Sequence, residues 1–132
     1  MQSMGSGRLE KWHAYHIWCA DYAQPHHQKC VCVCSHREWV LKINSEPPSG
    51  RKARTHAVIV SSFEANFLKH ESFLTVMPFR YHDDRVVVSI SKPENCFGII
   101  SPSLRAKIIE AINNNPSLTE EQRRFMIEDV PI

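Results

Sequence analysis

The middle third of the chain, residues 39–80, concentrates side chains that bind phosphate or transfer protons. Arginine donates paired hydrogen bonds to a phosphate, histidine exchanges protons near neutral pH, and a carboxylate accepts or returns a proton. These residue types fall in loops between apolar runs, where a small β-barrel carries functional groups on its rim. The side chains concerned are Glu46, Arg51, Arg54, His70, Glu71 and Ser72.

Cleavage of RNA through its own 2′-hydroxyl is the chemistry that these residue types suit. The reaction requires a base, an acid, and a cation or backbone amides that stabilise the charged phosphorane. We expect Arg54 to contact phosphate and His70 to transfer the proton, with Glu46 or Ser72 assisting. The expected nucleic-acid-binding cations are Arg51, Lys52, Lys69 and Arg80.

Each candidate also has an ordinary structural interpretation. Arg54 fits a solvated loop arginine, and His70 fits a residue that caps the turn before the next strand. The segment 44–47, which contains Glu46, has the composition of a plain turn.

Aromatic rings give a weaker signal for RNA. Unpaired bases stack on exposed rings, but most rings in a barrel this small fill its interior. The rings that qualify are Trp12, Tyr15, Trp18, Trp39, Phe67 and Tyr81. His26 and His27 directly follow Pro25, and we assign neither of them a role.

Length and composition indicate one folded domain. The chain has 132 residues, 42% of them hydrophobic, which is enough for a single core. We expect a flexible tail over residues 1–12 and one domain over 13–132. The formal net charge of +2 is too small to prove a nucleic-acid partner. No apolar run approaches the roughly 20 residues of a membrane span, so we expect a cytoplasmic protein. The sequence indicates no cofactor.

Five cysteines, an odd number, argue against a disulfide framework. Cys30, Cys32 and Cys34 alternate with valines, so on a strand their thiols share one face. Histidines nearby in the sequence raise a zinc site as an alternative, but same-face thiols lie roughly 6.5–7 Å apart, too wide to share one ion easily. We expect buried, reduced thiols, with metal binding or redox chemistry as alternatives.

Hydrophobic periodicity predicts six strands followed by two helices. The strands are expected at 14–22, 29–35, 39–44, 56–61, 73–79 and 85–91, with 56–61 buried on both faces, a loop at 47–52 and a helical turn within 63–70. Ser101 and Pro102 fit the start of a helix that ends near 113–116, and Thr119 with Gln122 fits a capping box for a helix over 120–128. This order predicts a mainly β protein with C-terminal helices, folded as a small SH3-like β-barrel.

Several segments resemble the MazF/PemK family of toxins. They are the aromatic strand HIWCADY, the arginine before a β-branched strand in RTHAVIVSS, the proline-containing LTVMPF and the late apolar helix. Arg54 then matches the family's arginine, with Thr55 where the family has proline. The segments INSEP and FLKHESF also resemble small phage or prophage proteins. The resemblance implies an SH3-like barrel that forms a homodimer, cuts RNA at short sequences and is held silent by an antitoxin.

Two functions of different classes follow from the sequence. The first is a metal-independent endoribonuclease of the toxin type that cleaves single-stranded RNA. The second is a non-catalytic SH3-like module that binds nucleic acid or an acidic protein partner through the same basic loop.

Overall fold

A computed structural model describes residues 8–19 and 26–131 of the chain. The strands run over β1 His13–Cys19, β2 His26–Cys34, β3 Trp39–Asn44, β4 Val58–Val60, β5 Ser72–Leu74 and β6 Cys96–Ile99. The helices run over α1 Arg51–Thr55, α2 Asp83–Ile90, the short 3-10 helix η1 Pro93–Asn95, α3 Pro102–Asn114 and α4 Glu120–Glu128.

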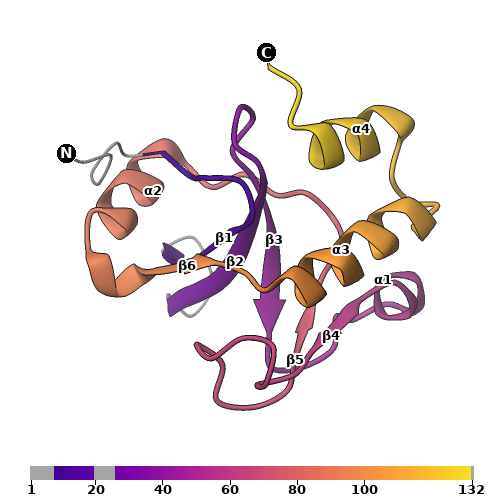
Figure 1. The fold of residues 1–132 in the computed structure, drawn as a ribbon, viewed down its shortest axis with the longest axis horizontal. Coiled ribbons are helices and arrows are strands. Elements are labelled where there is room, and N and C mark those ends of the chain that lie inside the picture. The colour runs from indigo at the N-terminus through magenta and orange to yellow at the C-terminus, as the bar shows by residue number, and fades with distance from the viewer. Residues whose placement is uncertain (1–7, 20–25, 132) are drawn as a thin grey trace.

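The strands form one antiparallel sheet in the order β4-β5-β3-β2-β1-β6. The sheet is curled into a half-barrel, and α3 and α4 lie on one side of it while α2 lies on the other (Figure 1). The prediction of a mainly β, barrel-like protein with C-terminal helices is therefore confirmed.

Strand alternation divides the core between the two faces of the sheet. The inner face, which carries Val31, Leu41 and Leu74, packs against α3 and α4 in the larger core cluster. The outer face, which carries Cys30 and Cys32, packs against α2 in a smaller cluster. The predicted shared face is confirmed for Cys30 and Cys32, whose thiols are buried and unbridged. Cys34 departs from it, because the pairing of β2 with β3 is irregular between Cys32 and Cys34, and its thiol bonds to Asp129 instead.

The two C-terminal helices begin where their capping residues indicate. The Ser101 hydroxyl accepts a hydrogen bond from the Leu104 backbone N–H at 3.2 Å, which satisfies a donor that the first turn of α3 leaves open. Thr119 and Gln122 form the reciprocal capping box at the start of α4. Both helix predictions are confirmed, because caps are local and their partners lie within three residues.

The predicted strand at residues 85–91 is wrong, since this segment is the helix α2. Asp83 and Asp84 occupy its first turn, where negative charge favours a helix N-terminus. Val86 is buried at 1% exposure, but Val88 is 60% exposed, which fits a helix with one apolar face. Valine lowers helix propensity by only a fraction of a kcal/mol, so packing of that face outweighs the β-branched composition.

Other boundaries are shorter than the sequence predicts. The strand expected over 56–61 is β4 alone, and its burial on both faces is wrong because β4 is an edge strand with Ile59 50% exposed. The strand expected over 73–79 is limited to β5, with a separate bridge from Phe79 to Val40. Part of the loop expected at 47–52 belongs to α1.

The N-terminal segment contributes to the core within its described part. Leu9 is 2% exposed and Trp12 is 8% exposed, although both lie in the segment predicted as a tail. Residues 1–7 of that segment, and residues 20–22 of the first predicted strand, lie outside the described residues.

Candidate functional site

A pocket of about 330 Å³ opens where β2 begins and β3 ends. The third wall is the segment between β4 and β5, so three separate parts of the chain meet there. We call it the strand-end pocket. Its lining residues are His27, Gln28, Lys29, Ile43, Asn44, Ser45, Leu68, Lys69, His70 and Ser72.

Hydrogen bonds on the outer face hold the ends of β2 and β3 together beneath the pocket. The Gln28 amide donates to the Asn44 side-chain oxygen at 2.7 Å, and the Tyr81 hydroxyl donates to the Gln28 oxygen at 3.3 Å. Gln28 is 5% exposed, and a buried amide with satisfied partners has one fixed orientation. The two strand ends are therefore held at a fixed spacing.

The strand-end pocket brings together two imidazoles and two ammonium groups. His27 and Lys29 come from β2, while Lys69 and His70 come from the segment before β5. None of the described lining residues is acidic. Concentrated positive charge without a carboxylate favours an anionic ligand such as a phosphate group.

The proton on the His70 ring has a defined position when the ring is neutral. Its Nδ1 lies 3.0 Å from the backbone carbonyl oxygen of Glu71. A carbonyl only accepts hydrogen bonds, so Nδ1 carries the hydrogen and Nε2 keeps the lone pair. Nε2 is therefore the atom at which neutral His70 takes a proton.

Ser72 supports this segment instead of presenting its hydroxyl to the surface. The side chain is 3% exposed, and its hydroxyl donates to the His70 carbonyl oxygen at 3.2 Å. Since β5 anchors Ser72 in the sheet, this bond fixes the backbone of His70 relative to the strands. Its geometry gives Ser72 a positioning role.

Five rings run in a continuous row beside the pocket. We call them the ring row: Trp18, His27, His16, Phe97 and Phe67. Successive ring centroids lie 5.1, 4.7, 5.9 and 4.7 Å apart. The order of the first three rings follows from the pairing of β1 with β2. In that pairing Trp18 lies opposite His27, and His16 lies opposite Lys29.

The ring row also joins the two ends of the curled sheet. Phe67 precedes β5, whereas Phe97 belongs to β6 at the opposite edge, and their rings stack with an interplanar angle of 4°. Both rings pack against the larger core cluster. The Phe67–Phe97 stack therefore closes the inner face next to the strand-end pocket.

His16 is held neutral by its surroundings. Burial lowers its pKa to about 4, and the nearby positive charge of Lys29 and the His27 ring contribute in the same direction. At neutral pH His16 is therefore an uncharged ring.

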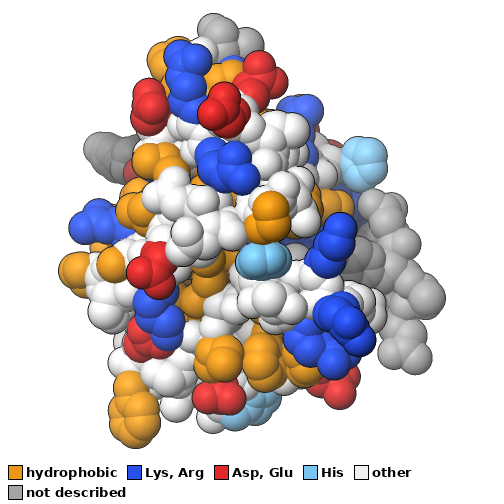
Figure 2. Space-filling view, turned by 90° about the vertical axis from the view of Figure 1, so that its right-hand side faces the viewer, with side chains coloured by type: hydrophobic (Ala, Val, Ile, Leu, Met, Phe, Trp, Pro, Cys, Tyr) orange, Lys and Arg blue, Asp and Glu red, His pale blue; other side chains and the backbone are white. Residues whose placement is uncertain are grey.

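Most of the other predicted site residues lie elsewhere on the surface. Arg51, Lys52 and Arg54 are exposed on α1, and Glu46 is exposed in the bend after β3; none of them lines the strand-end pocket. Figure 2 faces the side where α1 lies, and Lys and Arg side chains gather in its lower right part, with an acidic side chain directly below them and others scattered over the face.

Arg80 lies at the far end of β3 from the pocket. Its guanidinium pairs with Glu38 at 3.1 Å and with Asp83 at 2.9 Å. Glu38 precedes β3 and Asn44 ends it, so the pocket is about 20 Å away at the rise of an extended strand. The two carboxylates already neutralise the positive charge of Arg80.

Lys69, His70 and Ser72 are thus the predicted residues that meet in one pocket. Lys29 and His16 were missed, and His27 was noticed without a role. Alternation along 13–19 and 26–34 contains the signal, because residues of one parity share a face. Using it requires the register of β1 against β2, which is a long-range property.

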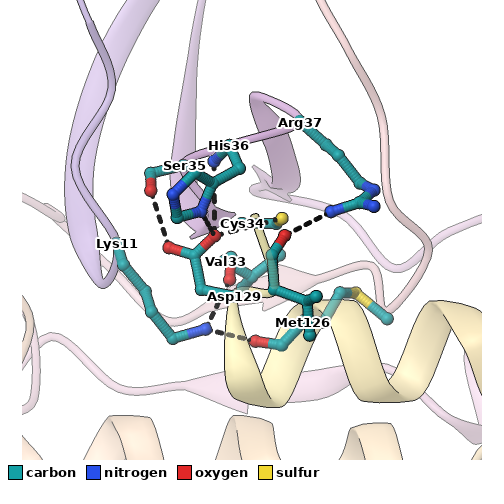
Figure 3. A network of polar contacts seen from close by, with 9 residues as sticks. Lys11, Val33, Cys34, Ser35, His36, Arg37, Met126 and Asp129 are labelled. Carbon is teal, nitrogen blue, oxygen red and sulfur yellow. Dashed lines mark hydrogen bonds and ion pairs between the residues drawn. The ribbon is translucent and has the colours of Figure 1, made fainter. Parts of the chain in front are cut away.

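A second polar cluster ties the end of α4 to the hairpin between β2 and β3 (Figure 3). The Asp129 carboxylate accepts hydrogen bonds from the Ser35 hydroxyl at 2.6 Å, the His36 ring at 2.8 Å and the Cys34 thiol at 3.3 Å. Burial raises the pKa of Asp129, but the hydrogen bonds from Ser35 and His36 outweigh it and leave the pKa well below its usual range. Lys11 donates to the carbonyl oxygens of Val33 and Met126 alongside.

A thiol, an imidazole and a carboxylate, as in Cys34, His36 and Asp129, are the groups of a thiol catalyst. Their geometry argues for a structural role instead. The thiol and the imidazole both bond to the same carboxylate. Burial raises the pKa of Cys34, which disfavours the reactive thiolate, and its side chain is 0% exposed. The cluster therefore links the end of α4 to the hairpin between β2 and β3.

Two wider properties of the described residues bear on function. Across residues 8–19 and 26–131, three or more His, Cys, Asp or Glu side chains are nowhere grouped so as to hold a metal ion. Within the same residues, none of the helices combines the length and the apolar character that crossing a membrane requires.

Comparison of the chain with known protein families, with characterised proteins and with solved structures found no match. The resemblance to MazF/PemK toxins therefore gains nothing from these comparisons, and the function is argued from the strand-end pocket.

Proposed function

We propose that the protein is a metal-independent endoribonuclease that cuts single-stranded RNA in the strand-end pocket. One observation carries the proposal: two imidazoles and two ammonium groups line the same pocket, and no carboxylate does among the described residues. Those are the groups that transesterification at a phosphodiester needs. They belong to His27, His70, Lys29 and Lys69.

His70 and His27 divide the proton transfers in this proposal. Nε2 of His70 takes the proton of the 2′-hydroxyl, and the 2′-oxygen attacks the adjacent phosphorus. The bond from phosphorus to the 5′-oxygen breaks, and that oxygen leaves with a proton from His27. The products are a 2′,3′-cyclic phosphate and a 5′-hydroxyl, so no oxidant or second substrate is consumed.

Lys29 and Lys69 supply the electrostatic part of the reaction. The phosphorane carries more negative charge than the phosphodiester, so fixed ammonium groups bind it more strongly than the ground state. An unpaired strand is the favoured substrate, because the ring row beside the pocket offers faces for exposed bases.

A non-catalytic nucleic-acid-binding module is the second candidate. It is favoured by the positions of Glu46 and Arg54, which lie outside the pocket, and by the buried hydroxyl of Ser72. In that case the same pocket and rings hold RNA without cutting it.

Incubation with a long unstructured RNA in chelator distinguishes the two functions. We expect the wild type to release fragments ending in 2′,3′-cyclic phosphate, and His70→Ala or His27→Ala to reduce the rate by at least about 100-fold. Arg54→Ala is the matched control outside the pocket and should cut at nearly the wild-type rate. His70→Ala purified in parallel also controls for contaminating nuclease.

Two outcomes overturn the endoribonuclease proposal. Cleavage that is unchanged in both histidine variants shows that the strand-end pocket is not the reacting site. RNA that is bound but left intact by the wild type establishes the non-catalytic module instead.

A further inference from the structure

We infer that Trp18 is a base-stacking platform for the nucleotide next to the phosphate held at His27 and Lys29. The inference rests on the proposed function for the position of that phosphate. It adds a subsite outside the strand-end pocket and a substrate class, an RNA segment whose base is unpaired on that side of the phosphate.

Trp18 differs from the two phenylalanines of the ring row in its relation to the core. Phe67 and Phe97 pack against the larger cluster, whereas Trp18 belongs to neither cluster that the described residues form and is partly exposed. Part of the indole remains in solvent at the strand end, where a base can cover it. Trp18 lies on the inner face of β1, because it alternates with Ile17, which packs in the outer cluster.

The position of Trp18 is fixed by its backbone. Its N–H donates to the hydroxyl of Ser89 on α2 at 3.0 Å, and Ser89 is 3% exposed. This bond falls where β6 no longer pairs with β1, since their pairing ends at Tyr15. α2 therefore takes the place of the missing strand and holds the backbone that carries the indole, which lowers the entropy cost of stacking a base on it.

His27 connects this platform to the pocket. Its ring centroid lies 5.1 Å from that of Trp18, and the residue also lines the strand-end pocket. The cross-strand pair places Trp18 directly beside His27, with Lys29 two residues further along the same face of β2. A nucleotide whose phosphate contacts Lys29 and His27 thus has its neighbouring base within reach of the indole.

The chemistry of the platform selects for an unpaired base and not for a particular one. An indole face stacks on purines and pyrimidines alike. A base inside a duplex has both faces covered and cannot use the site.

The test uses two probes of equal charge. The first is a 2′-O-methyl hexaadenylate, which cannot be cut, and the second is a chain of six tetrahydrofuran phosphates without bases. We expect Trp18→Leu to weaken binding of the first probe by about tenfold, because one stacked base is lost. Trp18→Phe, which keeps a ring, should bind the first probe within about twofold of the wild-type affinity. Both variants should bind the second probe as tightly as the wild type does.

Phe63→Ala provides the matched control, since Phe63 is a fully exposed ring outside the row. It should leave binding of both probes unchanged. The inference is overturned if Trp18→Leu binds hexaadenylate as tightly as the wild type does. It is also overturned if Trp18→Leu weakens binding of both probes equally, or if Phe63→Ala weakens binding of hexaadenylate as much as Trp18→Leu does. Trp18-dependent binding without any RNA cleavage would remove the endoribonuclease proposal but leave the stacking platform standing.

Discussion

At the scale of single residues, three histidines show how surroundings assign different roles to one side chain. His16 is kept neutral by burial and by Lys29, His70 has its Nδ1 hydrogen fixed by a carbonyl, and His36 bonds to the partly buried carboxylate of Asp129. The sequence predicted a role for His70 because it lies in a polar loop. It gave no reason to separate the other two, since their partners lie on other strands or at the C-terminus.

The low pKa of His16 makes stability depend on pH. Its pKa falls from 6.5 to about 4 on folding, so between these values the unfolded chain binds more protons and stability decreases as pH falls. We predict that the midpoint of urea unfolding drops between pH 6.5 and 4 more steeply for the wild type than for His16→Gln. Equal slopes for the wild type and His16→Gln would contradict the assignment.

The role of Asp129 depends on both its charge and its backbone conformation. The residue has a positive φ of 51°, which asparagine tolerates, so Asp129→Asn changes the charge with little change in shape. Because hydrogen bonds to a charged group contribute about 1.5–3 kcal/mol each, we predict a loss of about 1–3 kcal/mol in the free energy of unfolding. Urea denaturation measures it, with Glu128→Gln as the exposed neighbour. A loss below about 0.5 kcal/mol would mean that the cluster does not fasten α4 to the hairpin.

At the scale of elements, local signals could be read from the sequence and long-range ones could not. The caps at Ser101 and Thr119 specify α3 and α4 because donor and acceptor lie three residues apart. The valine run of α2 resembles a strand, and its packing on the outer face of β1, together with the acidic first turn, favours the helix instead. The strand-end pocket depends on the register of β2 with β3, which pairs Lys29 with Ile43, so Lys69 and His70 were found and Lys29 was not.

The helical state of α2 predicts a contrast between two neighbouring valines. Val86 is 1% exposed and Val88 is 60% exposed on the same helix. Val86→Ala should cost about 1.5–3 kcal/mol in the free energy of unfolding through lost burial, whereas Val88→Ala should stay within about 0.5 kcal/mol. In a strand of the alternating kind, residues 86 and 88 would share a face, and both substitutions would destabilise alike. Chemical denaturation of the two variants decides between these structures.

At the scale of the whole molecule, the curled sheet depends on a contact between its two ends. The segment before β5 carries both Phe67, which stacks on Phe97 of β6, and His70, which lines the strand-end pocket. Closure of the half-barrel and position of the pocket are therefore coupled through one short segment. The sequence predicted the barrel-like class from strand order, but it could not predict that two rings 30 positions apart would join the edges, because neither lies in a distinctive pattern.

This coupling predicts that loosening the ring stack affects stability and RNA together. A double-mutant cycle of Phe67→Ala and Phe97→Ala should give a coupling energy of about 0.5–1.5 kcal/mol in urea unfolding, as stacked aromatic pairs do. Phe67→Ala should also weaken binding of the uncuttable hexaadenylate, because the backbone at Lys69 and His70 loses its anchor on β6. Phe63→Ala, in the same loop but fully exposed, should change neither quantity. If Phe67→Ala destabilises the fold while RNA binding stays at the wild-type level, then Ser72 alone positions the pocket wall and the closure of the barrel is independent of the site.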